Sequence, residues 1–85
     1  MDNKKPATTG DPLNAAIAKV LRLAQTEVDI TDVALARKAD VKVQSLRRWL
    51  DDERPMPASP FVRITDALGV DASEVVRRAR QRLGE

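Results

Sequence analysis

Residues 31–50, TDVALARKADVKVQSLRRWL, contain two short runs with the apolar spacing of helices. In the first run, Leu35, Ala36 and Ala39 fall on one helical face; in the second, Leu46 and Trp49 do so. The residues between the runs lack this periodicity. The stretch therefore predicts two short helices joined by a tight turn.

The turn between these helices is read as Ala39-Asp40-Val41. A turn of this kind needs a residue with positive φ; glycine suits that conformation best, and aspartate is one of the few tolerated substitutes. The small Ala36 and the apolar Val41 would let the two helices pack at a steep angle. This pattern predicts a helix-turn-helix, whose second helix, expected at residues 43–51, enters the major groove of DNA.

The second helix should place polar side chains on its exposed face. At about 100° per residue, Leu46, Trp49 and Leu50 point inward, whereas Gln44 and Arg48 point furthest outward. Glutamine can pair with adenine and arginine with guanine, although an ordinary solvated helix face would look similar. The side chains predicted to contact DNA are Lys42, Val43, Gln44, Ser45, Arg47, Arg48 and Arg54.

Three further segments have helical periodicity and start signals. The first helix opens at Asp11-Pro12, the fourth at Ser59-Pro60 after a proline-containing loop, and the last at the capping-box-like Asp71-Ala-Ser-Glu. We expect these helices to end near residues 25–27, at Gly69 and near Gly84, respectively. Thr31 would cap the helix that contains Leu35 and Ala36. The sequence thus predicts an all-α, compact five-helix bundle.

Composition is consistent with a single small domain. The 85 residues are 42% apolar and carry a net charge of +2, and residues 1–10 lack a hydrophobic period. We therefore expect a disordered arm at 1–10 and one domain at 11–85. The absence of cysteine and histidine excludes disulfides, thiolate or imidazole metal sites and histidine-based catalysis. No apolar run approaches ~20 residues, so we expect a cytoplasmic protein with no membrane association.

Part of the chain resembles the Cro/C1-type, lambda-repressor-like helix-turn-helix family. The matching residues are Leu35-Ala36, Val41, Leu46, Trp49, Pro57, Ile64, Ala67-Leu68-Gly69-Val70-Asp71 and Glu74-Val75. The resemblance implies a five-helix bundle that binds operator DNA, usually as a repressor or regulator in bacteria or their phages. Three positions depart from the family pattern. Asp40 stands in place of the turn glycine, and Lys42 stands at the polar position that starts the helix after the turn. Leu50-Asp51-Asp52 stands where Glu-x-Gly is common at the exit of that helix.

A second resemblance is to excisionase and MerR-like winged helices, on the stretch VQSLRRWLDDERPMPA. Those domains have a β-hairpin after the helix, whereas residues 55–85 show no period-two alternation and contain two capped helical patterns. The Cro/C1 resemblance is therefore favoured.

Three classes of function follow from these observations. The leading prediction is a sequence-specific regulator that binds double-stranded DNA, with pairing of two copies as a homodimer on two half-sites. The alternative is an antitoxin-like or adaptor module that binds protein. An acidic or apolar exposed face on the helix at 43–51 would favour it. An enzyme has little support, because the chain has no histidine, cysteine or tyrosine and no glycine-rich phosphate loop. We expect no cofactor and no small-molecule ligand.

Overall fold

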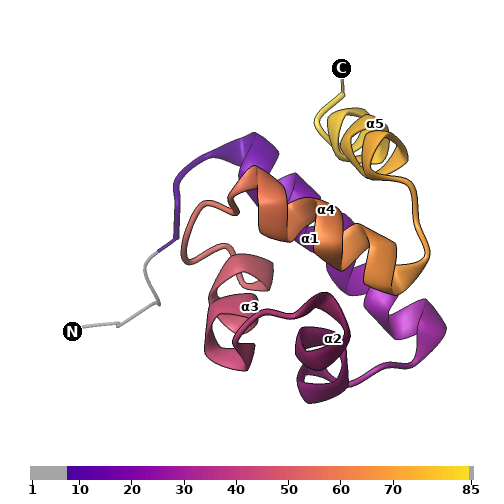
Figure 1. The fold of residues 1–85 in the computed structure, drawn as a ribbon. Coiled ribbons are helices and arrows are strands. Elements are labelled where there is room, and N and C mark those ends of the chain that lie inside the picture. The colour runs from indigo at the N-terminus through magenta and orange to yellow at the C-terminus, as the bar shows by residue number, and fades with distance from the viewer. Residues whose placement is uncertain (1–7, 85) are drawn as a thin grey trace.

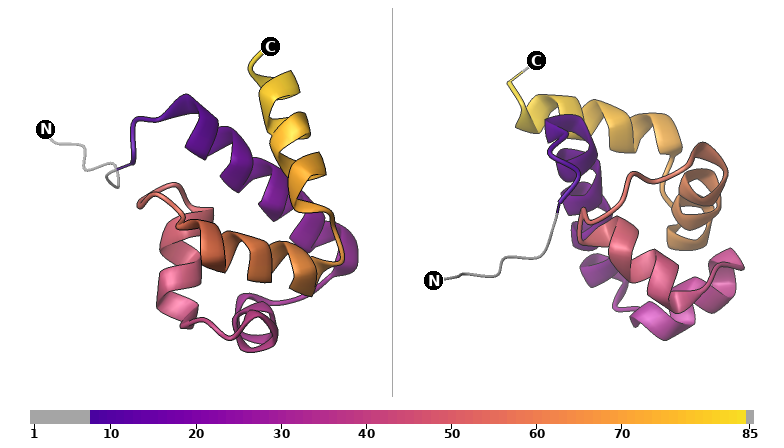
Figure 2. Two further views of the ribbon diagram at one scale, coloured as in Figure 1. Left: turned by 45° about the horizontal axis from the view of Figure 1, so that its top comes forward. Right: turned by 90° about the vertical axis from the view of Figure 1, so that its left-hand side faces the viewer.

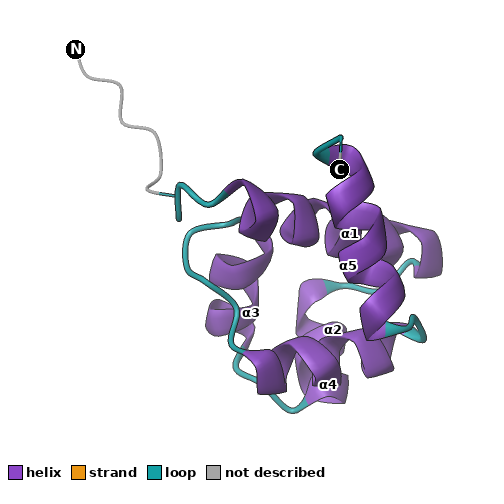
Figure 3. Ribbon diagram, turned by 90° about the horizontal axis from the view of Figure 1, so that it is seen from above, coloured by secondary structure: helices purple, strands orange, loops and turns teal. Residues whose placement is uncertain are grey.

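The computed structural model describes residues 8–84, which form five α-helices joined by short loops (Figure 1). The helices are α1 (Pro12–Val28), α2 (Asp32–Ala39), α3 (Val43–Leu50), α4 (Ala58–Leu68) and α5 (Ala72–Arg82). No strand is present in this part of the chain (Figure 3). The predicted all-α five-helix bundle is confirmed. None of the helices described is both long enough and apolar enough to cross a membrane.

Three helices begin with the caps that the sequence predicts. The Asp11 carboxylate accepts a hydrogen bond from the Leu13 amide at 3.0 Å. The Thr31 hydroxyl accepts one from Ala34 at 3.1 Å, and the Asp71 carboxylate one from Glu74 at 3.1 Å. Each bond satisfies an amide that the first turn of the helix leaves without a partner.

Several helix boundaries differ from the prediction. Pro57, not Ser59, caps α4, because its extended backbone already leads into a helix beginning at Ala58. The Ser59 hydroxyl instead accepts a hydrogen bond from Arg63 Nη2 at 3.0 Å. α3 ends at Leu50, one residue before the predicted end, and α1 continues to Val28.

The capping box predicted for α5 is only half formed. The Glu74 carboxylate bonds Arg77 and Arg78 on the next turn, at 2.6 and 2.9 Å, rather than closing back onto the cap. These two ion pairs lower the pKa of Glu74 to about 2. The exposed arginines of α5 compete successfully for this carboxylate.

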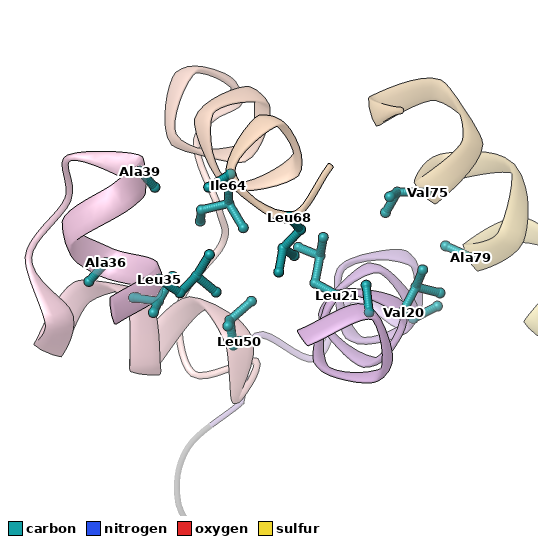
Figure 4. Packing of buried hydrophobic residues seen from close by; sticks show 14 residues of the cluster. Val20, Leu21, Leu35, Ala36, Ala39, Leu50, Ile64, Leu68, Val75 and Ala79 are labelled. Carbon is teal, nitrogen blue, oxygen red and sulfur yellow. The ribbon is translucent and has the colours of Figure 1, made fainter. Parts of the chain in front are cut away.

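Every helix contributes a fully enclosed side chain to one core. These side chains are Leu21, Leu35, Leu46, Ile64 and Val75, each at most 2% exposed. Figure 4 shows four of them converging from α1, α2, α4 and α5. Trp49 is less enclosed than predicted: it is half-buried and packs against the edge of the core. The core is therefore built from aliphatic side chains and not around the single tryptophan.

Helix α5 lies at the end of the molecule opposite α2 and α3, as the views in Figures 1 and 2 agree. Within residues 8–84 it packs on α1 and α4 alone. Within α5, Val75 and Ala79 are buried and Val76 is half-buried, whereas Leu83 at its C-cap is 37% exposed. Burial of this helix thus fixes α1 and α4 without contributing to the surface around α3.

The turn between α2 and α3 has the geometry predicted from Asp40. This residue is left-handed, with φ 59° and ψ 50°, and its amide donates to the carbonyls that end α2. The Val41 amide donates to the Ala36 carbonyl at 3.0 Å, and Val41 packs against the core. Arg63 of α4 donates through Nη1 to the Asp40 carbonyl at 3.2 Å. The direction of α3 is set at this turn.

Replacing Asp40 by glycine should stabilise the fold, because glycine adopts positive φ without the steric penalty of a β-carbon. We expect the free energy of unfolding of Asp40→Gly to rise by about 0.5–1 kcal/mol in a denaturant titration. The matched control is Ala34→Gly at an exposed position within α2, which should lower it by about 1 kcal/mol. Equal losses in both variants would contradict the proposed role of the turn residue.

Candidate nucleic-acid interface

Helix α3 presents a polar face to solvent because its apolar residues are directed into the bundle. Leu46 and Leu50 are buried, and Val43 and Trp49 pack at the edges of the core. The opposite face is formed by exposed Gln44, Arg47 and Arg48 together with half-buried Ser45. No residue of α3 is acidic. This eight-residue helix therefore combines one apolar side with one neutral-to-basic side.

The structure brings most of the predicted DNA-contacting residues onto this surface. Lys42 is exposed at the start of α3, and Arg54 is exposed in the loop that follows the helix. Lys42 occupies the N-cap position without a side-chain cap bond, and the Arg54 amide donates back to the Arg48 carbonyl at 3.3 Å. Val43 is the exception within the predicted set, because it packs partly against the core.

A hydrogen-bonded ion network ties α3 to α1 and α2. The Asp32 carboxylate, in the first turn of α2, accepts bonds from Arg22 Nη1 and Gln25 Nε2 of α1, both at 2.8 Å. It also accepts one from Arg47 Nε of α3 at 3.1 Å. Arg22 Nη2 in turn donates to Asp51, the C-cap of α3, at 2.8 Å. Three helices are thus joined through one carboxylate.

The network is anchored in the interior by Gln25. This side chain is only 7% exposed, and its Nε2 also donates to the Ile30 carbonyl at 3.0 Å. The hydrogen bond from Gln25 is the largest cause of the low pKa of Asp32, about 2; the bonds from Arg22 and Arg47 add to it against the effect of burial. Asp32 is therefore ionised at any physiological pH.

A second set of bonds fixes the loop that leaves α3. Asp52, a positive-φ residue, accepts hydrogen bonds through its carboxylate from Thr9 Oγ1 and Asn14 Nδ2, both at 2.7 Å. The Thr9 amide also donates to the Asp52 carbonyl at 2.9 Å. Thr9, in the predicted arm, thus lies against this loop, whereas residues 1–7 of that arm lie outside the described residues.

Sequence reasoning missed these two anchors. It did not use Arg22, and it used Asp51 and Asp52 only as departures from a family pattern. The available signal was an arginine followed three residues later by a glutamine within one predicted helix. The partners of Arg22 on α2 and α3 could not be chosen without the three-dimensional arrangement.

Across residues 8–84, no histidine, cysteine or acidic side chains are grouped so as to hold a metal ion.

Comparison with known proteins shows the fold. The crystal structure of the clp gene regulator ClgR from Corynebacterium glutamicum superposes with a TM-score of 0.79 at 19% sequence identity, covering 85% of this chain and 77% of that one. The two proteins share a fold. No protein-family model matches the chain, and no curated protein sequence does so. The resemblance to the Cro/C1 family therefore stays a prediction from the sequence.

Acidification should remove the stabilisation that Asp32 provides. Because its folded-state pKa of about 2 lies below the ordinary 3.8, this contribution is complete above pH about 4 and is lost as the pH falls toward 2. The group still contacts solvent, so we expect Asp32→Asn to unfold more easily by on the order of 1 kcal/mol at pH 7.

Denaturant titrations of the parent and of Asp32→Asn over pH 2–7 would measure this effect. The difference between the two proteins should shrink toward zero near pH 2. A difference that stays constant across this range would show that the ionised carboxylate is not the source of the stabilisation.

Proposed function

We propose that this protein is a sequence-specific transcription regulator that binds double-stranded DNA with α3 in the major groove. The observation that carries the proposal is the exposed face of α3, with Gln44 and Arg48 at its centre, on a helix held rigidly by the Asp40 turn and the Asp32 network. The fold shared with ClgR, itself described as a gene regulator, supports it. A protein-interaction module would favour an acidic or apolar face, and α3 has neither.

The predicted contact residues fall into three groups by position. Gln44 and Arg48 project furthest from the core and would read base edges, glutamine at adenine and arginine at guanine. Ser45 and the exposed part of Val43 lie along the half of α3 that leads into the groove. Lys42, at the start of the helix, and Arg54, in the loop after it, would contact phosphates. Base readout and backbone contact are thus assigned to different residues.

The resemblance to Cro/C1 proteins extends the proposal to a repressor or Cro-like role at an operator, in a bacterium or its phage. A recognition helix held in the major groove represses most simply by occupying DNA that a polymerase needs. Site selection is the property that this role requires, and it depends on the α3 face.

Replacing Arg48 by alanine should weaken binding to the preferred duplex by about 1–3 kcal/mol and relax the preference at one base pair. Binding would be measured by fluorescence anisotropy on the preferred duplex, on its single-base variants and on a random duplex. The control is Arg78→Ala on α5, a change of equal charge on a helix that does not contact α3. Equal losses on preferred and random duplexes would show that Arg48 contacts only phosphate.

We further propose that the protein is monomeric in solution and binds an inverted repeat as a pair. One eight-residue helix offers few base contacts, so a second copy about one helical turn away would supply the remaining specificity. The exposed arginines of α5 repel one another across any symmetric contact of that helix, so pairing without DNA would be weak.

Sedimentation of the free protein, stoichiometric titration of a duplex and footprinting of the complex would test this assembly. The expected result is a monomer that saturates the duplex at two copies. A single bound copy with a protected region of half a helical turn would contradict pairing on DNA.

A further inference from the structure

Arg47 differs from the other polar residues on the exposed face of α3. It lies at the edge of that face nearest the first turn of α2, and its Nε donates to Asp32 Oδ2 at 3.1 Å. Its side chain is nevertheless 51% exposed. One donor of the guanidinium is thus engaged by the protein, while the group as a whole remains accessible from the side that would face DNA.

The partner carboxylate is held before Arg47 reaches it. Asp32 Oδ1 accepts from both Arg22 Nη1 and Gln25 Nε2 at 2.8 Å, which leaves Oδ2 for Arg47. Gln25 is buried, and Arg22 is fixed at its other end by Asp51. Asp32 therefore offers Arg47 a fixed acceptor in place of a mobile surface carboxylate.

We propose that Asp32 is a positioning residue, which orients Arg47 for contact with a DNA backbone phosphate at the edge of the groove. This inference rests on the proposed function. In a helix-turn-helix the first helix crosses the backbone while the second enters the groove, so the edge between α2 and α3 faces phosphate. With Nε engaged by Asp32, the two amino groups of the guanidinium present a planar pair of donors, which suits a phosphate.

The sign of the change in DNA affinity when Asp32 is removed distinguishes a positioning role of Asp32 from a simple effect of its charge. Two arginines, Arg22 and Arg47, face two carboxylates, Asp32 and Asp51. A carboxylate near the backbone repels phosphates, so charge alone predicts that removing Asp32 strengthens binding to any duplex. Positioning predicts the opposite sign, because a released Arg47 loses conformational freedom when it binds.

The experiment measures DNA affinity by anisotropy between 50 and 200 mM salt for the parent, Asp32→Asn, Arg47→Ala and the double variant. Arg47→Ala should weaken binding to preferred and random duplexes alike and reduce the salt slope by about 1. Asp32→Asn should weaken binding about two- to fivefold in the parent and should fail to weaken it when Arg47 is already alanine. Glu53→Gln is the matched control: it removes an exposed carboxylate from the loop after α3 that belongs to none of the ion pairs of Arg22 or Arg47, and should not weaken binding.

A second measurement uses the unmodified protein and does not depend on any variant folding. The Nε–H of Arg47 should give an NMR signal protected from solvent exchange, which persists in the complex with the duplex while the amino-group signals shift. Loss of that protection on binding would show that Arg47 leaves Asp32 to reach DNA, and would overturn the proposal.

The remaining outcomes are also decisive. Tighter binding by Asp32→Asn, or equal effects of Asp32→Asn with and without Arg47, would overturn the positioning role while leaving DNA recognition by α3 intact. A parent protein that shows no duplex preference would overturn the proposed function, and the role of Asp32 with it.

Discussion

The placement of α3 depends on the ionised carboxylate of Asp32, which binds side chains of α1 and α3 at once. The leucines and valines of the core determine that five helices pack together, but apolar contacts are not directional and tolerate small rotations of a short helix. Hydrogen bonds to a fixed acceptor define such a rotation more closely. The network ties both ends of the helix-turn-helix unit, Asp32 at the start of α2 and Asp51 at the end of α3, to Arg22 of α1, and the turn at Asp40 sets the direction of α3 relative to α2.

The local features of this fold could be predicted from the sequence because their causes are local. Asp11, Thr31 and Asp71 cap helices through amides only two or three residues away, and Asp40 adopts positive φ for reasons contained in the turn itself. Asp29 and Asp52 adopt the same conformation, with φ of 56° and 59°, and were not predicted. Nothing in the neighbouring residues separates an aspartate that ends a helix from one that is simply solvated.

Features that depend on distant partners could not be predicted. The Arg22–Asp32 and Arg22–Asp51 pairs span 10 and 29 residues, and the chain offers many other acidic residues to pair with an arginine. The extent to which Trp49 is enclosed likewise depends on how α3 is placed against the rest of the bundle. For the candidate site, periodicity was sufficient to identify the exposed residues of α3, whereas the distinct environment of Arg47 became visible only once α2 was placed beside it.

Two groups of basic residues, on α3 and on α5, lie on different surfaces and have different roles in this account. Those of α3 lie beside the turn and the network that orient them, whereas those of α5 lie at the opposite end of the molecule and include two that pair with Glu74. The net charge of +2 alone therefore does not indicate how selectively the protein could bind DNA.

The most direct test of recognition by α3 is selection by the purified protein from a pool of random duplexes. The account predicts enrichment of one motif, which disappears when Gln44 and Arg48 are both replaced by alanine. No enrichment over the starting pool, or enrichment that survives this double replacement, would contradict recognition by α3.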